Sequence, residues 1–394
     1  MYKKILAYKK YFFYGLSIVF GRGLEYIVLL YAALNLTKDV YGELEFYKKL
    51  IELLAVAMAF GLPSLLLTYT RSKNSKIYLS VLSFLFIVLL LLIISPLLWA
   101  FDYFFLATPV LFHAVFFNNG ILPVFFITQM GSNYASLYKS LVSFLFYMGV
   151  FLIIVFHPNP QMAFVIVNYY LIGVGLIFIG LIFGRYKIKK RALYKYYKLF
   201  KKLLLSSLTL VVSNFANIMF LYTDIMLLKL ISSTPDIDIA NYSFALNIAN
   251  MIILIPLTMV QVDIESIKKR IGLKSLNRKI IGLVLLSLII IIGFYLLLIN
   301  TYYDKYYDTF VLFLIILAAK LFQSMSTLHG ALILIQKKFK INLVINLSVL
   351  IFNIILSYIF YVKLNLFGIA LASVITLGVR YLILKKHSEY HAVN

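Results

Sequence analysis

The sequence contains no cysteine and few charged residues, and both shortages narrow the range of possible functions. Without cysteine there is no disulfide, no thiol nucleophile and no cysteine-ligated metal site. Charged residues make up 13% of the 394 residues, whereas an ordinary soluble domain carries about 25%. Hydrophobic residues make up 63%, so most of the chain cannot face water.

Hydrophobic runs recur along the whole chain, and each is long enough to cross a hydrocarbon core of roughly 30 Å as a helix. The sequence therefore predicts an all-α polytopic membrane protein with about twelve transmembrane helices. The predicted spans lie at residues 11–35, 43–70, 77–100, 104–128, 137–156, 163–184, 203–231, 239–262, 280–300, 309–335, 341–361 and 366–384. The run at 104–128 contains Pro109, Gly120 and Pro123, so we expect a broken helix there.

Acidic residues are scarce, with 14 against 37 basic residues and a net charge of +23. The basic residues form short clusters in every second connection between the predicted spans, and the intervening connections contain few of them. This pattern does not predict a nucleic-acid-binding face; it follows the positive-inside rule for membrane topology. We therefore expect both termini on the cytoplasmic side of the membrane.

The longest basic connection, residues 185–202, lies at the middle of the chain. It divides the sequence into an N-terminal lobe at 1–184 and a C-terminal lobe at 203–394, each with about six predicted spans. Its lysines and tyrosines suit either an interfacial helix on anionic lipid or a solvated basic loop. Tyr41 and Tyr242 both open the second span of their half, which suggests an internal repeat with a binding site between the lobes.

Ionisable residues inside the predicted spans are few, and each costs about 2.5 to 3.5 kcal/mol to insert unless it has a partner, water or a function. We select Arg22, Glu25, Asp224 and Lys320 as candidate substrate-binding residues. Arg22 and Glu25 are three apart and could simply pair. In the functional alternative they line a wet cavity, where Arg22 binds a phosphate oxygen. Asp224 could bind an ion or anchor a cation of the bundle.

Other polar residues in or near the spans have plainer interpretations. We expect Lys229 and Arg380 to extend toward the membrane surfaces. Two pairs spaced four apart, Glu45 with Lys49 and Lys48 with Glu52, favour a solvated helix end with paired charges. The secondary cavity candidates are polar side chains that could bind sugar hydroxyls or hold helices together. They are Asn214, Asn217, Gln323 and His329.

The sequence offers no support for a catalytic or cofactor-binding centre. It has no phosphate-binding loop, and its connections are too short to fold alone. The histidines His113 and His329 lack a second ligand at helical spacing, so we expect no metal. We also expect no cofactor other than a coupling ion, either H⁺ or Na⁺, and no enzymatic activity.

Three segments, residues 37–66, 220–260 and 341–376, together resemble the bacterial polysaccharide flippases, the O-antigen-type transporters of the multidrug/oligosaccharidyl-lipid/polysaccharide exporter superfamily. The resemblance covers the whole chain in span number and order, although its individual motifs are loose. Carried over by position, it points mainly to packing residues and to Asp224. The matching residues are Tyr41, Gly42, Asp224, Tyr242, Pro256, Asn346, Asn353, Gly368, Ala370, Ala372 and Ser373.

The resemblance implies a V-shaped pair of six-helix lobes that moves an undecaprenyl-diphosphate-linked oligosaccharide from the cytoplasmic to the periplasmic leaflet by alternating access. It also implies membrane lipid, a polysaccharide polymerase and a chain-length regulator as partners. Two alternatives stay open: a drug or metabolite antiporter of the same superfamily, and a membrane enzyme of glycan assembly such as a polymerase. A lipid II flippase would be expected to have about two more spans.

Overall fold

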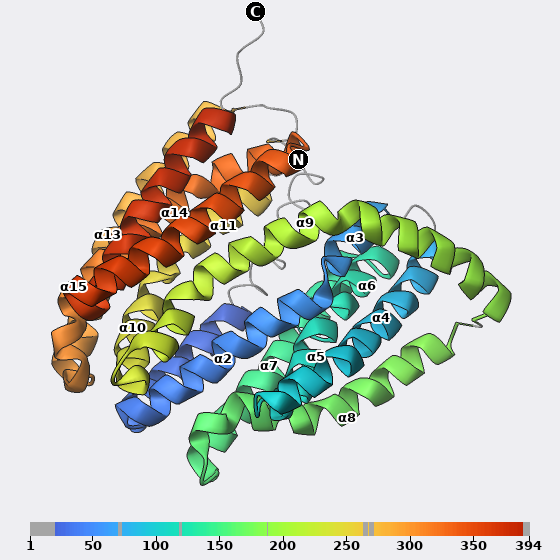
Figure 1. Ribbon diagram of the computed structural model, residues 1–394, viewed down its shortest axis with the longest axis horizontal. Helices are drawn as coiled ribbons and strands as arrows, with labels where there is room; N and C mark the ends of the chain where they lie inside the picture. The colour runs from blue at the N-terminus through green and yellow to red at the C-terminus, as the bar shows by residue number, and fades with distance from the viewer. Residues whose placement is uncertain are drawn as a thin grey trace, which may run out of the picture. The chain divides into compact units, whose positions relative to one another are not determined.

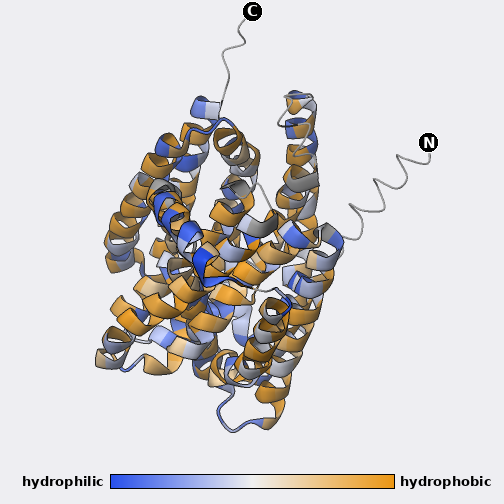
Figure 2. Cartoon of the chain, turned by 90° about the vertical axis from the view of Figure 1, so that its right-hand side faces the viewer, coloured by the Kyte–Doolittle hydropathy of each residue, from blue (hydrophilic) through white to orange (hydrophobic). Residues whose placement is uncertain are grey.

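The computed structural model describes residues 20–69, 73–117, 120–186, 188–262, 267 and 272–388. Within these residues every regular element is a helix, so the all-α prediction is confirmed (Figure 1). Hydrophobic residues cover most of the length of the helices (Figure 2). Backbone groups in hydrocarbon must be satisfied within their own segment, which a helix achieves.

The described helices follow one another along the whole chain. In the first half they are a helix over residues 20–35, α2 (Lys38–Ala59), α3 (Leu62–Tyr69), α4 (Lys73–Ala100), η1 (Phe104–Leu106), α5 (Ala107–Val115), α6 (Ile121–Gln129), α7 (Ser132–Phe156), η2 (Pro160–Met162) and α8 (Ala163–Gly184). In the second half they are α9 (Lys190–Ile231), α10 (Pro235–Ala249), α11 (Met251–Val262), α13 (Leu273–Thr301), η3 (Asp304–Thr309), α14 (Phe310–Ile335) and α15 (Phe339–Ser388).

The chain forms two compact units. Unit 1 comprises the described residues of Met1–Tyr31 and Tyr47–Val211, and unit 2 those of Ala32–Phe46 and Val212–Asn394. The division therefore falls inside the first helix, inside α2 and inside α9, whereas the sequence placed it at residues 185–202. It also assigns the start of α2 to the same unit as the second half of the chain.

Several predicted spans are interrupted. The expected break in 104–128 is confirmed, since α5 and α6 are separate helices. The predicted span 43–70 is also broken, because Phe60 and Gly61 have φ angles of 48° and 65°, outside the right-handed helical region. The predicted span 239–262 consists of α10 and α11, which are bent by 40° at a short break.

Helix α15 is a hairpin of two helices. Its 50 residues contain one non-helical residue, Asn365, with φ 50° and ψ −135°. A Cβ added to Gly368 would lie 2.2 Å from the Phe360 carbonyl oxygen, although eight residues of straight helix span about 12 Å. The chain therefore reverses near Asn365, which agrees with the two predicted spans 341–361 and 366–384.

Six helices among the described residues are long and apolar enough to cross a membrane, or seven if the bent pair α10 and α11 counts as one span. This number is below the predicted twelve because some predicted spans share one helix, are divided into short helices or carry several charges. Helix α15 counts once although it contains two predicted spans, α5 and α6 are short, and α2 carries several charged residues. The predicted start of the first span, at residue 11, lies outside the described residues.

The basic connection is largely helical. Helix α9 begins at Lys190 and continues without interruption to Ile231, so the solvated-loop alternative is wrong for residues 190–202. Within unit 1 the ring of Tyr196 stacks on that of Tyr78 with centroids 4.9 Å apart, and Phe200 packs edge-on against Phe86. These contacts attach the start of α9 to α4.

Candidate functional site

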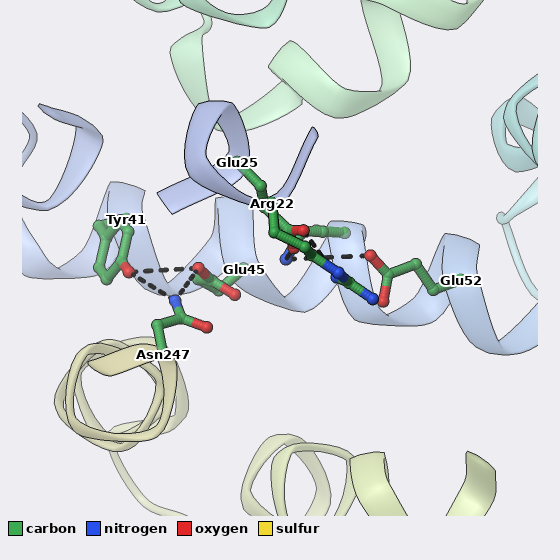
Figure 3. Close-up of polar contacts among 7 residues, drawn as sticks. Arg22, Glu25, Tyr41, Glu45, Glu52 and Asn247 are labelled. Carbon is green, nitrogen blue, oxygen red and sulfur yellow. Dashed lines mark hydrogen bonds and ion pairs between the residues drawn. The ribbon is translucent and has the colours of Figure 1, made fainter. Parts of the chain in front are cut away.

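Unit 1 contains a buried cluster of charges on the first helix and α2. The Glu25 carboxylate accepts from two cations, with Arg22 Nη1 at 2.7 Å and Lys48 Nζ at 2.6 Å. The side chains of Glu25 and Lys48 are 8% and 2% exposed, whereas that of Arg22 is 52% exposed. The pairing of Arg22 with Glu25 is thus present, but Glu25 also bridges to a second cation that the sequence did not connect with it (Figure 3).

Lys48 corrects one of our expectations. We expected Glu45, Lys48, Lys49 and Glu52 to form a solvated helix end, yet the first three are buried. Lys48 also lies 3.8 Å from Glu52, the expected pairing at four residues' spacing. One signal in the sequence could have indicated this. Charged residues such as Arg22 and Glu25 inside a span need partners at the same depth in a neighbouring helix.

The charge cluster continues into a tight pocket within unit 1. Lys48, Glu52 and His113 line it together with the aromatic side chains of Phe146, Tyr147 and Phe164 and with Ile51. The pocket leaves no enclosed space for a water molecule. His113 is buried, and its Nε2 has no hydrogen-bond partner among the described residues.

In unit 2 a single carboxylate is surrounded by neutral donors. Tyr242 donates to Asp224, as do Ser373 Oγ at 2.7 Å and Asn353 Nδ2 at 3.2 Å. All four side chains are buried. We call these residues the Asp224 layer. Resemblance to known flippases had listed them by position, mostly as packing features, and the structure brings them together around Asp224.

A second polar group in unit 2 surrounds a cation. Arg380 Nη2 donates to Asn217 Oδ1 at 2.6 Å and to Asn346 Oδ1 at 3.2 Å, and its guanidinium carbon lies 6.0 Å from the Phe220 ring centroid. We call Arg380, Asn217 and Asn346 the Arg380 layer. The expectation that Arg380 extends to the membrane surface is wrong, because its guanidinium bonds to the neighbouring helices.

The two layers share one spacing. Asn217 precedes Asp224 on α9, Asn346 precedes Asn353 in the first part of α15, and Ser373 precedes Arg380 in the second part, each by seven residues. Seven residues are close to two helical turns, about 10 Å along the axis, so both layers use the same faces of the three helices. This repeated spacing was visible in the sequence and could have connected Arg380 with the asparagines.

A further polar contact joins the beginning of α2 to α10 within unit 2. Asn247 Nδ2 donates to Glu45 Oε1 at 2.7 Å and to Tyr41 Oη at 3.3 Å, while Tyr41 Oη donates to Glu45 Oε1 at 3.2 Å. All three side chains are buried, and they come from the two elements that Figure 3 shows. Tyr41, which the resemblance listed as a packing residue, thus also forms hydrogen bonds. The sequence analysis did not predict that Glu45 and Asn247 would be its partners.

The remaining candidates are dispersed. Lys320 is buried and donates to Gln323 Oε1 at 3.1 Å, three residues further along α14. His329 Nδ1 is 2.7 Å from Ser388 Oγ. This contact joins α14 to the end of α15, as expected if His329 holds helices together. Lys229 Nζ pairs with Asp236 Oδ1 at 2.7 Å, and both side chains are partly exposed. The side chain of Asn214 lies outside the described residues.

The part of the chain that the structure describes contains no group of three histidine, cysteine, aspartate or glutamate residues that could hold a metal ion. The polar residues of the charge cluster and of the two layers can offer hydrogen bonds and charge to a ligand or an ion. Buried ionisable groups at bilayer depth mark substrate or ion pathways by default. The charge cluster of unit 1 and the two layers of unit 2 are the candidate functional sites.

Comparison with known proteins agrees with this interpretation. Residues 7–264 match the family model described as polysaccharide biosynthesis protein. A search of curated proteins gives no match.

Among solved structures, the lipid II flippase MurJ in an inward closed conformation is similar with a TM-score of 0.65 and 16% identity, over 95% of this chain and 87% of that chain. An inward-facing multidrug resistance transporter of the MATE family and MOP superfamily has a TM-score of 0.64 and 14% identity, over 96% of this chain and 93% of that chain. The Vibrio cholerae MATE transporter VcmN, as a D35N mutant, has a TM-score of 0.64 and 12% identity, over 98% of both chains. The chain is a multi-pass membrane protein with the fold of MOP-superfamily transporters.

Proposed function

We propose that this chain, which belongs to the polysaccharide biosynthesis protein family, moves an undecaprenyl-diphosphate-linked oligosaccharide across the bacterial inner membrane, from the cytoplasmic to the periplasmic leaflet. It does so by alternating access, without catalysis, and with both termini in the cytoplasm. The observation that carries the proposal is the bridged cluster in unit 1. There the Glu25 carboxylate already lies between two cations, Arg22 and Lys48.

An anionic headgroup can take over this arrangement. A diphosphate presents oxygens that guanidinium and ammonium groups bind through charge-assisted hydrogen bonds. Arg22 is half exposed and Lys48 is buried beside it, so the headgroup would reach Arg22 first and then compete with Glu25 for Lys48. Lys320 in unit 2 is a further candidate cation, as the sequence suggested. The prenyl chain stays in lipid.

A coupling ion belongs to the same proposal. The hydrogen bonds to the buried Asp224 carboxylate come from neutral donors, and Lys320 is close enough to interact with it electrostatically. A buried ionisable group of this kind is a candidate for an ion pathway. We assign H⁺ or Na⁺ coupling to Asp224. A polymerase and a chain-length regulator act as partners that use the translocated glycan.

The test is flipping of a lipid-linked oligosaccharide in proteoliposomes, with surface glycan in a transporter-deficient host as the cellular readout. We expect Arg22→Ala, Lys48→Met and Lys320→Ala to abolish both while the proteins still insert. Wild-type transport by all three variants would refute the headgroup assignment. Lys363→Ala, which removes an exposed lysine of α15, is the control for loss of positive charge.

A second candidate function, a drug or metabolite antiporter of the same superfamily, is favoured by the buried carboxylates Asp224 and Glu45. Such a protein would exchange organic cations for H⁺ or Na⁺ and would not need the cations of unit 1. Efflux of a cationic dye that requires Asp224 but is unaffected by Arg22→Ala would support it over the flippase.

A further inference from the structure

The Arg380 layer contains a positive charge that the neighbouring groups do not neutralise. Arg380 bonds only to the amide oxygens of Asn217 and Asn346, and no carboxylate of the described residues lies within ion-pair distance of it. Asp224, the opposite charge on the same helix faces, lies about two turns away along α9, or roughly 10 Å. The guanidinium cannot lose its proton, because arginine stays charged in proteins.

The hydrogen-bond donors of Arg380 are only partly used. A guanidinium has five N–H donors, and both hydrogen bonds that Arg380 makes to the described residues come from Nη2. Nε is buried and has no partner among the described residues, and neither hydrogen bond to the asparagines uses Nη1. The planar group is held in place by the two asparagines and by the Phe220 ring, so its unused donors have a fixed direction.

Asn217 supplies a further donor beside the guanidinium. Its Oδ1 accepts from Arg380, so its Nδ2 lies close by, and this amide nitrogen makes no hydrogen bond to the other described residues. Ser213 and Asn342 continue the polar surface, since Asn342 Nδ2 donates to Ser213 Oγ at 2.8 Å. The group as a whole presents positive charge and N–H donors but no anionic acceptor.

We propose that Arg380 and Asn217 form an anion subsite within unit 2 that binds a phosphate group of a membrane lipid or of a lipid-linked sugar. Phosphate oxygens match guanidinium and amide N–H donors, and phosphates are the anions that membrane lipids carry. Only the identity of the phosphate-bearing molecule rests on the proposed flippase function. The subsite is separate from the charge cluster of unit 1.

The experiment measures inorganic diphosphate binding to purified full-length protein in a neutral detergent by isothermal titration calorimetry. Arg22→Gln is the background, so that the proposed headgroup site of unit 1 does not dominate. In this background we expect Arg380→Gln to weaken diphosphate binding about tenfold or more, since loss of one charge-assisted bond corresponds to at least a factor of ten. Asn217→Leu should weaken it less, and Lys363→Gln should leave it unchanged.

Arg380→Lys makes the test independent of a folding defect. It keeps the charge but replaces the planar fork by a single ammonium, so we expect a folded protein with intermediate affinity. If Arg380→Gln fails to fold, the other variants decide the test. We then expect the diphosphate affinity to be highest for Arg22→Gln alone, lower when Asn217→Leu is added, and lowest when Arg380→Lys is added instead. Equal affinities across these variants would overturn the proposal.

The source of the phosphate is determined by repeating the titration in nanodiscs. If the ligand is a phospholipid, phosphatidylglycerol in the nanodisc weakens diphosphate binding relative to phosphatidylcholine alone, and Arg380→Gln removes this competition. If the ligand is the lipid-linked sugar, phosphatidylglycerol has no such effect. These measurements report binding and need no transport. A failure of the flippase proposal in cells can therefore be told apart from a failure of the anion subsite.

Discussion

The charge cluster of unit 1 and the two layers of unit 2 represent different solutions to burying charge in a membrane protein. In unit 1, Glu25 neutralises Arg22 and Lys48 directly, at 2.7 and 2.6 Å. In unit 2, Asp224 and Arg380 are each held by neutral hydroxyls and amides. The first arrangement is internally compensated. In the second, Arg380 has no carboxylate of the described residues within ion-pair distance.

The largest expected effect comes from breaking the compensated cluster. Glu25→Gln removes the carboxylate that lies 2.6 Å from the ammonium group of the buried Lys48, whereas the Glu52 carboxylate is more distant, at 3.8 Å. Removing one partner of a buried ion pair costs about 3 to 5 kcal/mol, so we expect a large fall in the free energy of unfolding in detergent. Denaturant or thermal unfolding of the purified variant provides the measurement.

A double variant provides the control for this prediction. Replacing buried ion pairs by neutral groups of similar volume is often close to neutral, so Glu25→Gln with Lys48→Met should recover much of the lost stability. Arg22→Gln should cost no more than about 1 kcal/mol, because Arg22 is half exposed and Glu25 keeps Lys48 as a partner. Equal costs for Glu25→Gln and Arg22→Gln would show that burial does not distinguish the two cations.

The contrast between the units also explains what the sequence could and could not predict. Hydrophobic runs and charge alternation predicted the helices, the broken segment at 104–128 and the two helices of α15. Arg22 with Glu25 was predicted as a pair because the two are close in sequence. Lys48 was assigned to a solvated helix end, because its spacing to Glu52 supplied a local partner and nothing in α2 alone indicated that the first helix covers it.

The layers of unit 2 illustrate a different limit. Asp224 was selected because a lone carboxylate in a span is costly, but its partners come from residues up to 149 positions away. Arg380 was dismissed because it lies near a helix end, where arginine commonly extends to the interface. The periodicity of one helix does not show which faces of three helices meet. Once the contacting helices are known, their common seven-residue spacing indicates which polar residues form a layer together.

A second prediction concerns the close backbone contact in the α15 hairpin, which aligns the helices that form the layers. A Cβ at position 368 would lie 2.2 Å from the Phe360 carbonyl oxygen, so Gly368→Ala must separate two backbones. Overpacking costs about 1 to 3 kcal/mol, and we expect the upper end. We also expect disruption of both layers, measured as loss of diphosphate binding together with a lower unfolding temperature.

Gly149→Ala in unit 1 is the matched control. There the added Cβ would meet a methyl group of Val167 at 2.6 Å, and a side chain can move at lower cost than backbone. A loss of stability in Gly149→Ala as large as in Gly368→Ala would contradict the interpretation that the hairpin contact is backbone-limited.

A smaller effect on stability, but a large one on transport, is expected for Asp224→Asn. The amide keeps an acceptor for Asn353 or Ser373 while removing a buried charge, so the free energy of unfolding should change by only about 1 kcal/mol. Cation-dependent transport should be lost, because the amide cannot replace the carboxylate as a cation ligand. Transport at different Na⁺ concentrations and pH values in proteoliposomes measures this, and cation-dependent transport by Asp224→Asn would move the coupling site elsewhere.

A comparably small effect on stability tests whether neutral partners stabilise a cation elsewhere in unit 2. Lys305 Nζ donates to the carbonyl oxygens of Leu34 and Leu36, at 3.1 and 2.6 Å, where the first helix ends and its last carbonyls have no intrahelical donor. Lys305→Ala should therefore lower the free energy of unfolding by about 0.5 to 1.5 kcal/mol, against no measurable change for Lys363→Ala. Lys305→Met keeps an apolar side chain of similar length but has no ammonium group, so it loses both the carbonyl bonds and the contact of Nζ with the Tyr306 ring. If Lys305→Met is as stable as the unmodified protein, the carbonyl bonds contribute nothing, and neutral partners in unit 2 position cations without stabilising them.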